Sequence, residues 1–221
     1  MEDNIILSGI VGSVAYGLDH AESDVDVIGV YQLPTREILS LGNTGRSIVS
    51  VQPDVTLHEL EKYLRLGLKC NPIILDLLWL PDHLYQYKTK AGERLISMRT
   101  AFLSTKKVMD AYIGCARGFM RSYMTGITIR NITDSKLPKY AFRILEQAHQ
   151  LLAYGETKVA VSNRTKYDRM DEMHASELME EFKNEISLLD KVVENGFSKL
   201  PEEQDYSGIN NFLLEERMRF V

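Results

Sequence analysis

The stretch Gly9–Val30, GIVGSVAYGLDHAESDVDVIGV, places a glycine-serine turn ten residues before two aspartates in a β-branched run. Asp24 and Asp26 are two residues apart, so a strand would direct both side chains to one face of a sheet. Two adjacent carboxylates repel each other unless cations neutralise them. Hard divalent ions, above all Mg²⁺, suit such a pair because they also bind substrate phosphates. The stretch therefore predicts a divalent cation site.

The turn at Gly12 and Ser13 has the composition of a phosphate site. A strand that ends in Gly-Ser at the start of a helix offers backbone N–H groups, a hydroxyl and the positive end of the helix dipole to phosphate oxygens. A phosphate site at the turn together with a metal-ion site at the two aspartates is typical of nucleotide binding. Tyr16 and Gly17 follow the turn, and two interpretations stay open for them: contact with the nucleotide, or a structural role as a packed ring and a residue of positive φ.

The composition excludes a membrane protein and a disulfide-rich one. The 221 residues are 44% hydrophobic and 26% charged, and no apolar run approaches the ~20 residues that span a bilayer. Cys70 and Cys115 lack C-x-x-C spacing, and the acidic start MEDNIILSGI is unlike a signal peptide. These features predict a cytoplasmic protein with reduced thiols.

Charge is distributed unevenly along the chain. Residues 99–169 hold 13 Lys and Arg against 5 Asp and Glu, whereas residues 170–221 hold 5 against 13. Within the basic segment Lys136, Lys139 and Arg143 share one face of an expected helix and would bind a triphosphate or a nucleic-acid backbone. The alternative is that the basic and acidic segments form ion pairs with each other.

The hydrophobic pattern divides the chain into two lobes. Strand and helix patterns alternate up to residue 98, and long helical patterns follow from residue 99 to residue 221. Three of the expected helices end near Gly126, Gly155 and Gly196. The strands are expected at 4–11, 25–33 and 47–57, a helix at 57–70, and a second helix from Asn71 that finishes as a short strand before Pro81.

Three segments, in order, resemble a known family. Gly-Ser, ten residues and then Asp-x-Asp in an apolar strand resembles the DNA polymerase β-like nucleotidyltransferase superfamily. The segments GSVAYG…SDVDVIGVYQLP, DVTLHELEKYLRLGLKCNPIILDLLWLP and KLPKYAFRILEQAHQLLAYGE resemble its predicted nucleotidyltransferases of the RNA-repair-pathway DNA polymerase β type. The resemblance implies an α+β fold, in which a small mixed β-sheet core flanked by helices (1–98) is followed by an all-helical lobe (99–221).

The resemblance also implies a reaction, the transfer of a nucleoside monophosphate from an NTP to an acceptor hydroxyl, with an RNA end as the first acceptor. Two Mg²⁺ ions, for which Mn²⁺ substitutes, would stabilise the attacking and leaving oxygens. Asp24, Asp26 and Asp54 would be the catalytic metal ligands, with Glu59 or Glu61 as alternatives to Asp54. The expected nucleotide-binding residues are Gly12, Ser13, Tyr16, Gly17, Lys136, Lys139 and Arg143.

One position departs from the family pattern, and two other functions stay open. The family often has a histidine four residues after the first lysine of the helical lobe, but Tyr140 stands there. A phenol with a pKa near 10 cannot replace imidazole as a proton shuttle at neutral pH. The alternatives are a protein AMP-transferase of the toxin-antitoxin type and a catalytically silent nucleotide-binding module.

Overall fold

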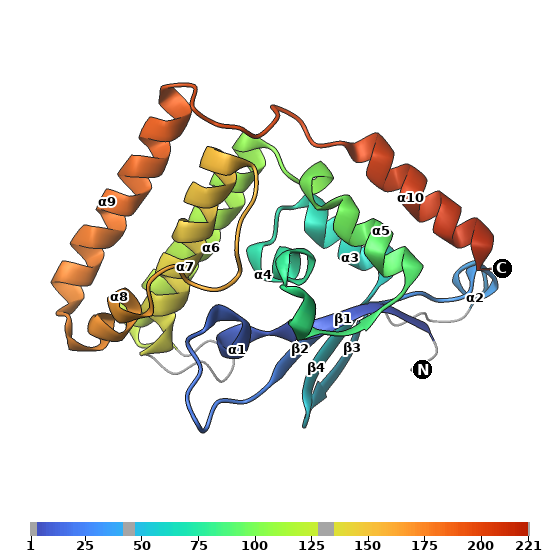
Figure 1. Cartoon of the computed structure of the whole chain (residues 1–221), viewed down its shortest axis with the longest axis horizontal. Helices are drawn as coiled ribbons and strands as arrows, with labels where there is room; N and C mark the ends of the chain where they lie inside the picture. The colour runs from blue at the N-terminus through green and yellow to red at the C-terminus, as the bar shows by residue number, and fades with distance from the viewer. Residues whose placement is uncertain (1–3, 42–46, 128–134, 221) are drawn as a thin grey trace. The chain divides into compact units, whose positions relative to one another are not determined.

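Contacts divide the chain into two units in the computed structural model, which describes residues 4–41, 47–127 and 135–220 (Figure 1). The first unit comprises residues 1–103 together with 204–221, and the second comprises residues 104–203. The first unit holds a mixed sheet with helices, and the described part of the second is helical. The predicted α+β class, with a mixed-sheet core and a helical lobe, is confirmed.

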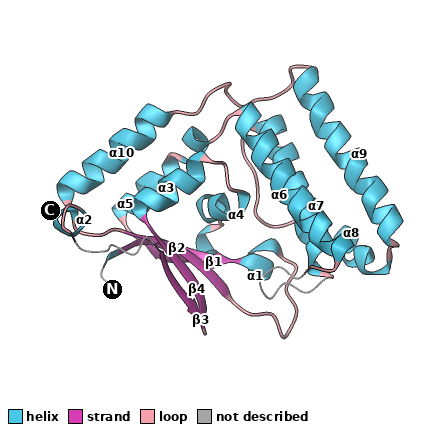
Figure 2. Cartoon of the chain, turned by 180° about the vertical axis from the view of Figure 1, so that it is seen from behind, coloured by secondary structure: helices cyan, strands magenta, loops and turns pink. Residues whose placement is uncertain are grey.

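The sheet has five strands in the order β3-β4-β2-β1-β5 (Figure 2). Strands β2 and β4 run parallel, and the other neighbouring pairs run antiparallel. The central strands β1 and β2 are almost entirely buried because their sequences, IILSGIV and DVIGVY, are rich in β-branched residues. The strands are β1 (Ile5–Val11), β2 (Asp26–Tyr31), β3 (Ser47–Val51), β4 (Asp54–Glu59) and β5 (Tyr85–Lys88).

Helices of the first unit pack against the sheet where glycine lets them approach. A Cβ atom at Gly9 of β1 would lie 2.5 Å from Leu80, and one at Gly92 of α5 would lie 2.3 Å from the Ile6 carbonyl oxygen. Helices α3, α4 and α5 lie on the same side of the sheet in both views (Figures 1 and 2). The helices here are α1 (Gly12–Tyr16), α2 (Thr35–Ile38), α3 (Leu60–Leu68), α4 (Pro72–Leu75), η2 (Asp76–Trp79), η3 (Asp82–Leu84), α5 (Lys90–Ser97), η4 (Arg99–Phe102) and α10 (Tyr206–Arg219).

Three local predictions differ from the structure. The segment 47–57, expected as one strand, is the hairpin β3-β4, because Gln52 and Pro53 form a tight turn between the strands. The segment before Pro81 continues as the 3₁₀ helix η2 instead of a strand, and β5 follows it without having been predicted. The helix start at Asn71 is correct, since its side chain accepts hydrogen bonds from two backbone N–H groups of α4.

The second unit is built on α6 (Thr105–Thr125), α7 (Lys136–Tyr154) and α9 (Ala175–Glu194), with α8 (Arg164–Arg169) and η5 (Met170–Glu172) between the last two. Helices α6 and α7 end at Gly126 and Gly155, as predicted. In the described ranges no helix is both long and apolar enough to cross a membrane.

The C-terminal helix corrects the predicted domain boundaries. The sequence pattern assigns all of 99–221 to the helical lobe, but α10 packs within the first unit. Glu216 of α10 is buried and accepts a hydrogen bond from Arg94 of α5, and Arg217 pairs with Glu59 of β4 at 2.6 Å. These partners lie more than 120 residues away in the sequence, so a pattern of local hydrophobicity carries no signal of them.

The Arg217–Glu59 pair provides a test of this attachment. Both side chains are nearly buried, with 13% and 6% exposed, so Arg217→Ala leaves an unpaired buried carboxylate and should lower the free energy of unfolding by about 3 kcal/mol. The control Arg219→Ala removes a 62% exposed side chain of the same helix and should cost less than about 1 kcal/mol. Urea denaturation measures the free energy of unfolding of both variants. Equal losses would contradict the attachment of α10 through the Arg217–Glu59 pair.

A second test concerns the acidic side of the helical unit. The His149 imidazole, 3.4 Å from Glu185, and the Lys166 ammonium, 2.8 Å away, lower the pKa of the Glu185 carboxyl to about 2. A depressed folded-state pKa adds stability above the unfolded pKa, and this stability is lost as the pH falls. Glu185→Gln should therefore flatten the dependence of unfolding free energy on pH between about 5 and about 2, whereas the exposed Glu181→Gln should not.

Candidate functional site

The Asp26 carboxylate lies directly against the backbone of the glycine-serine turn. Val11, the last residue of β1, pairs with Asp26, the first residue of β2. Gly12 follows with a φ of +69°, and a Cβ atom there would lie 1.9 Å from Oδ2 of Asp26. Any side chain at Gly12 would be strained and would displace the carboxylate, so only glycine allows this contact. The two halves of the predicted site therefore meet at the end of β1.

Parallel pairing brings Asp54 to the same end of the sheet. Val27 of β2 pairs with Val55 of β4, so Asp26 and Asp54 begin neighbouring strands in register. Residues that lie opposite each other on paired strands direct their side chains to the same face of the sheet, so the Asp26 and Asp54 side chains share one face. Asp26 is half-buried and Asp54 is exposed, which leaves the second carboxylate open to solvent.

Asp24 lies in the loop before β2 and is exposed. The strand begins only at Asp26, so the predicted alternation along a strand does not extend to Asp24. In the ranges that the structure describes, no three His, Cys, Asp or Glu side chains gather as a metal site. The structure brings Asp26 and Asp54 into register, and it leaves Asp24 on the adjoining loop.

The two alternatives to Asp54 are engaged elsewhere. Glu59 closes β4 at its far end, where it binds Arg217 and accepts a hydrogen bond from the backbone N–H of Glu61. The Glu61 carboxylate pairs with Arg65 at 2.8 Å. Asp54 is therefore the acidic residue of β4 at the same end of the sheet as Asp26.

The five-residue helix α1 contains Ser13 and Tyr16, and Gly17 is its C-cap. Ser13 is buried at the start of the helix next to Gly12. The Tyr16 ring is also buried, and its hydroxyl donates a hydrogen bond of 3.0 Å to Asp76. Gly17 ends the helix with a φ of +67°. The contacts of Tyr16 and Gly17 support the structural interpretation of both.

Asp76 is a polar residue of this region that the sequence analysis did not single out. It is 1% exposed in the 3₁₀ helix η2 and accepts the Tyr16 hydrogen bond. A single acid inside the apolar run NPIILDLLWLP was the available signal, because buried carboxylates need hydrogen-bond partners.

The predicted basic face of α7 is not an exposed strip. Arg143 is 2% exposed in the core of the helical unit and donates to Gln147 at 2.9 Å. Lys139 forms an ion pair with Asp171 of η5 at 2.7 Å. Because α7 packs against both α6 and α9, the side of the helix that carries Arg143 points into the core. The three cations do not form one surface.

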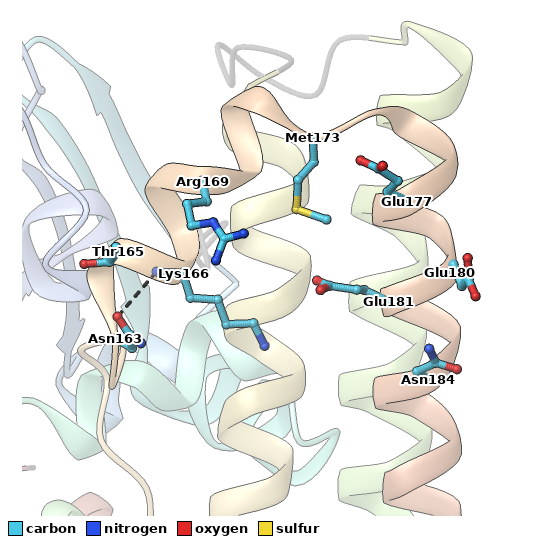
Figure 3. A pocket seen from close by; sticks show the side chains of 9 residues that line it. All are labelled: Asn163, Thr165, Lys166, Arg169, Met173, Glu177, Glu180, Glu181 and Asn184. Atoms are coloured by element: carbon cyan, nitrogen blue, oxygen red, sulfur yellow. Dashed lines mark hydrogen bonds between the residues drawn. The ribbon is translucent and has the colours of Figure 1, made fainter.

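A groove of about 750 Å³ lies between the segment that begins at Asn163 and helix α9 (Figure 3). Lys166 and Arg169 contribute cations to one wall, and Glu177 and Glu181 contribute carboxylates to the other. The Lys166 ammonium binds Glu185 and lies 5.6 Å from the Phe142 ring centroid. The groove has mixed charge and does not extend a basic surface for RNA.

A comparison with known protein families finds a match for this chain. The family model described as the RNA repair pathway DNA polymerase beta family matches residues 2–213. None of the curated proteins matches the chain. Since the match spans nearly the whole sequence, this chain belongs to the RNA repair pathway DNA polymerase beta family.

Proposed function

We propose that this protein is a divalent-metal-dependent nucleotidyltransferase that transfers a nucleoside monophosphate from an NTP to an acceptor hydroxyl. The contact of the Asp26 carboxylate with the Gly12 backbone carries the proposal, because it would place a metal ligand directly beside a phosphate-binding turn. Family membership supports the same class of chemistry.

The donor chemistry of these residues fits Mg²⁺. Asp26 and Asp54 offer carboxylate oxygens in register at one end of the sheet, and Asp24 offers a third on the adjoining loop. Hard divalent cations prefer oxygen ligands and share them with substrate phosphates. Two bound ions would supply charge stabilisation to the attacking and leaving oxygens of an in-line displacement.

The residues of the chain would divide the remaining work between them. Ser13 and the backbone N–H groups of its turn would hold the terminal phosphates. The acceptor oxygen attacks the α-phosphorus and forms the new P–O bond, while the bond to the β-phosphate oxygen breaks and pyrophosphate leaves. Asp54 would accept the proton of the acceptor hydroxyl, since its carboxylate is exposed to solvent beside Asp26.

The family description makes an RNA end the first acceptor class to assay. The RNA-binding surface expected on the helical unit is not supported, because its cations bind other side chains of the protein: Lys139, Arg143 and Lys166. The second candidate, transfer to a protein hydroxyl, does not depend on such a basic surface.

Replacement of Asp26 tests the metal and phosphate assignment. Asp26→Asn should abolish labelled-nucleotide transfer with Mg²⁺ or Mn²⁺, because an amide is a much weaker ligand for hard cations. The protein should remain folded, since removing one of two neighbouring negative charges relieves repulsion in the metal-free state. The control Glu22→Gln removes an exposed acid from the same loop and should retain transfer. An active Asp26→Asn enzyme would exclude the proposed role.

The Gly12 contact is tested by a matched pair of alanine substitutions. Gly12→Ala and Gly17→Ala both place a Cβ at a φ near +70°, which strains the backbone by about 1–2 kcal/mol. Only at Gly12 does the new atom meet Asp26, because nothing lies within 4 Å of a Cβ at Gly17. Calorimetry should show that Gly12→Ala loses nucleotide affinity at least about tenfold more than Gly17→Ala. Equal losses would place the nucleotide elsewhere.

A further inference from the structure

A second groove, of about 460 Å³, lies between helices α6 and α9 of the second unit; we call it the α6–α9 groove. Five of the eight described side chains that line it are apolar, and the other three are cations. The apolar ones are Met120 and Met124 of α6 and Met179, Phe182 and Ile186 of α9, and the cations are Arg117, Arg121 and Lys183. Among the described residues no carboxylate lines the groove, although the chain has a net charge of −5.

The lining residues follow the spacing of one helix face on both walls. Positions i, i+3, i+4 and i+7 lie on the same side of a helix. This pattern runs from Arg117 to Met124 on α6 and from Met179 to Ile186 on α9. The groove therefore extends along the two helices for about two turns, roughly 10 Å. A channel between two parallel rows of this kind accepts the side-chain ridge of a further helix.

Burial divides the apolar side chains into a fixed floor and an accessible rim. Met120 and Phe182 are 1% and 4% exposed, and the Phe182 ring packs edge to face against Phe142 of α7, with ring centroids 5.9 Å apart. Helices α6, α7 and α9 all contact one another, which holds this floor in place (Figures 1 and 2). Met124 is 50% exposed and Met179 is half-buried. Methionine is flexible and polarisable and is common on surfaces that bind helices of varied sequence.

The three cations of the groove are open to a ligand. Arg117, Arg121 and Lys183 are exposed, and none of them forms an ion pair with another residue in the described ranges. Lys139 and Lys166 of the same unit, by contrast, are both bound to carboxylates. The cations stand on both walls, since two belong to α6 and one to α9. A complementary ligand therefore carries negative charge on both sides of an apolar ridge.

We propose that the α6–α9 groove binds an acidic amphipathic α-helix of a partner protein. Apolar side chains at i, i+3 or i+4, and i+7 of that helix would fill the groove over Met120 and Phe182, as in other cases of a helix bound in a groove. Glu or Asp residues on its two flanks would pair with Arg117 and Arg121 on one side and with Lys183 on the other. This interaction is independent of the proposed nucleotidyl transfer.

The charges and the apolar floor favour a helix over other anionic ligands. A fatty acid carries a single negative charge at one end, so it would leave the cations of one wall unpaired. An RNA backbone would pair with the cations but has no apolar ridge for the floor. Phe182 is the aromatic ring among the described lining residues, and at 4% exposed it offers too little surface for a base to stack on.

The test measures the binding of labelled peptides to the full chain by fluorescence anisotropy. The probe is a helical peptide with Leu and Met at i, i+3, i+4 and i+7 and Glu on both flanks, and the same residues in scrambled order serve as its control. The blocking variant carries Arg121→Glu and Lys183→Glu. The matched control carries Lys106→Glu and Lys191→Glu, exposed positions of the same two helices outside the groove, so both proteins have the same net charge.

We expect the acidic helix to bind, with a loss of affinity of about tenfold or more in the blocking variant and less than about twofold in its control. The scrambled peptide should bind at least about tenfold more weakly than the ordered one. Met124→Gln should also weaken binding, whereas Met218→Gln, at a 70% exposed position of α10, should not. Circular dichroism verifies that each variant is folded, as expected for substitutions of exposed side chains.

Equal losses in the two double variants would indicate a general charge effect and overturn the proposal. Equal binding of the scrambled peptide, or no binding of the acidic helix at about 100 μM, would overturn it as well. A long-chain fatty acid and an RNA oligonucleotide are assayed in parallel, and binding of either one alone, lost in the blocking variant, would assign the groove to that ligand. A dimer in sedimentation that only the blocking variant dissociates would assign it to a second copy of this chain.

Discussion

The contact between the Asp26 carboxylate and the Gly12 backbone is the constraint on which the candidate site depends. A residue with a side chain at position 12 would have to occupy the space that the carboxylate already fills, at 1.9 Å from its oxygen. The pairing of Val11 with Asp26 delivers both groups to this point from separate strands. The proposed phosphate-binding turn and the proposed metal ligand are consequently in direct contact.

Strand order brings a second carboxylate to this end of the sheet. The parallel pairing of β2 with β4 sets Asp54 in register with Asp26, and the hairpin from β3 to β4 places exposed valines next to Asp54. The far end of β4 is anchored in a different way, because Glu59 pairs with Arg217 of the C-terminal helix. One end of β4 is thus held by a nearly buried ion pair, while the other carries the exposed carboxylate.

Two lysines of the helical unit form ion pairs within it. Lys139 pairs with Asp171, and Lys166 pairs with Glu185. In both pairs the cation comes from the basic segment 99–169 and the anion from the acidic segment 170–221. For these two lysines, the basic and acidic segments of the sequence supply complementary partners in the fold. Exposed ion pairs of this kind contribute little stability individually, but they remove cations from a potential nucleic-acid surface.

Local patterns in the sequence determined the helix start at Asn71 and the helix ends at Gly126 and Gly155, and the family resemblance gave the α+β fold class. These features depend on residues close together in the chain, where periodicity and capping chemistry carry the information. The hairpin was missed because a proline within a β-branched run is typical of an edge strand or a bulge as well as of a turn between two strands.

Only the tertiary structure decided which residues are partners across long separations. It placed the C-terminal helix with the sheet, buried Arg143 in the helical core, joined Tyr16 to Asp76 and set Asp54 beside Asp26. Helix periodicity puts Lys136, Lys139 and Arg143 on one face, but it does not say whether that face meets solvent or another helix. That outcome depends on the packing of elements far apart in the chain, which no local pattern of residues encodes.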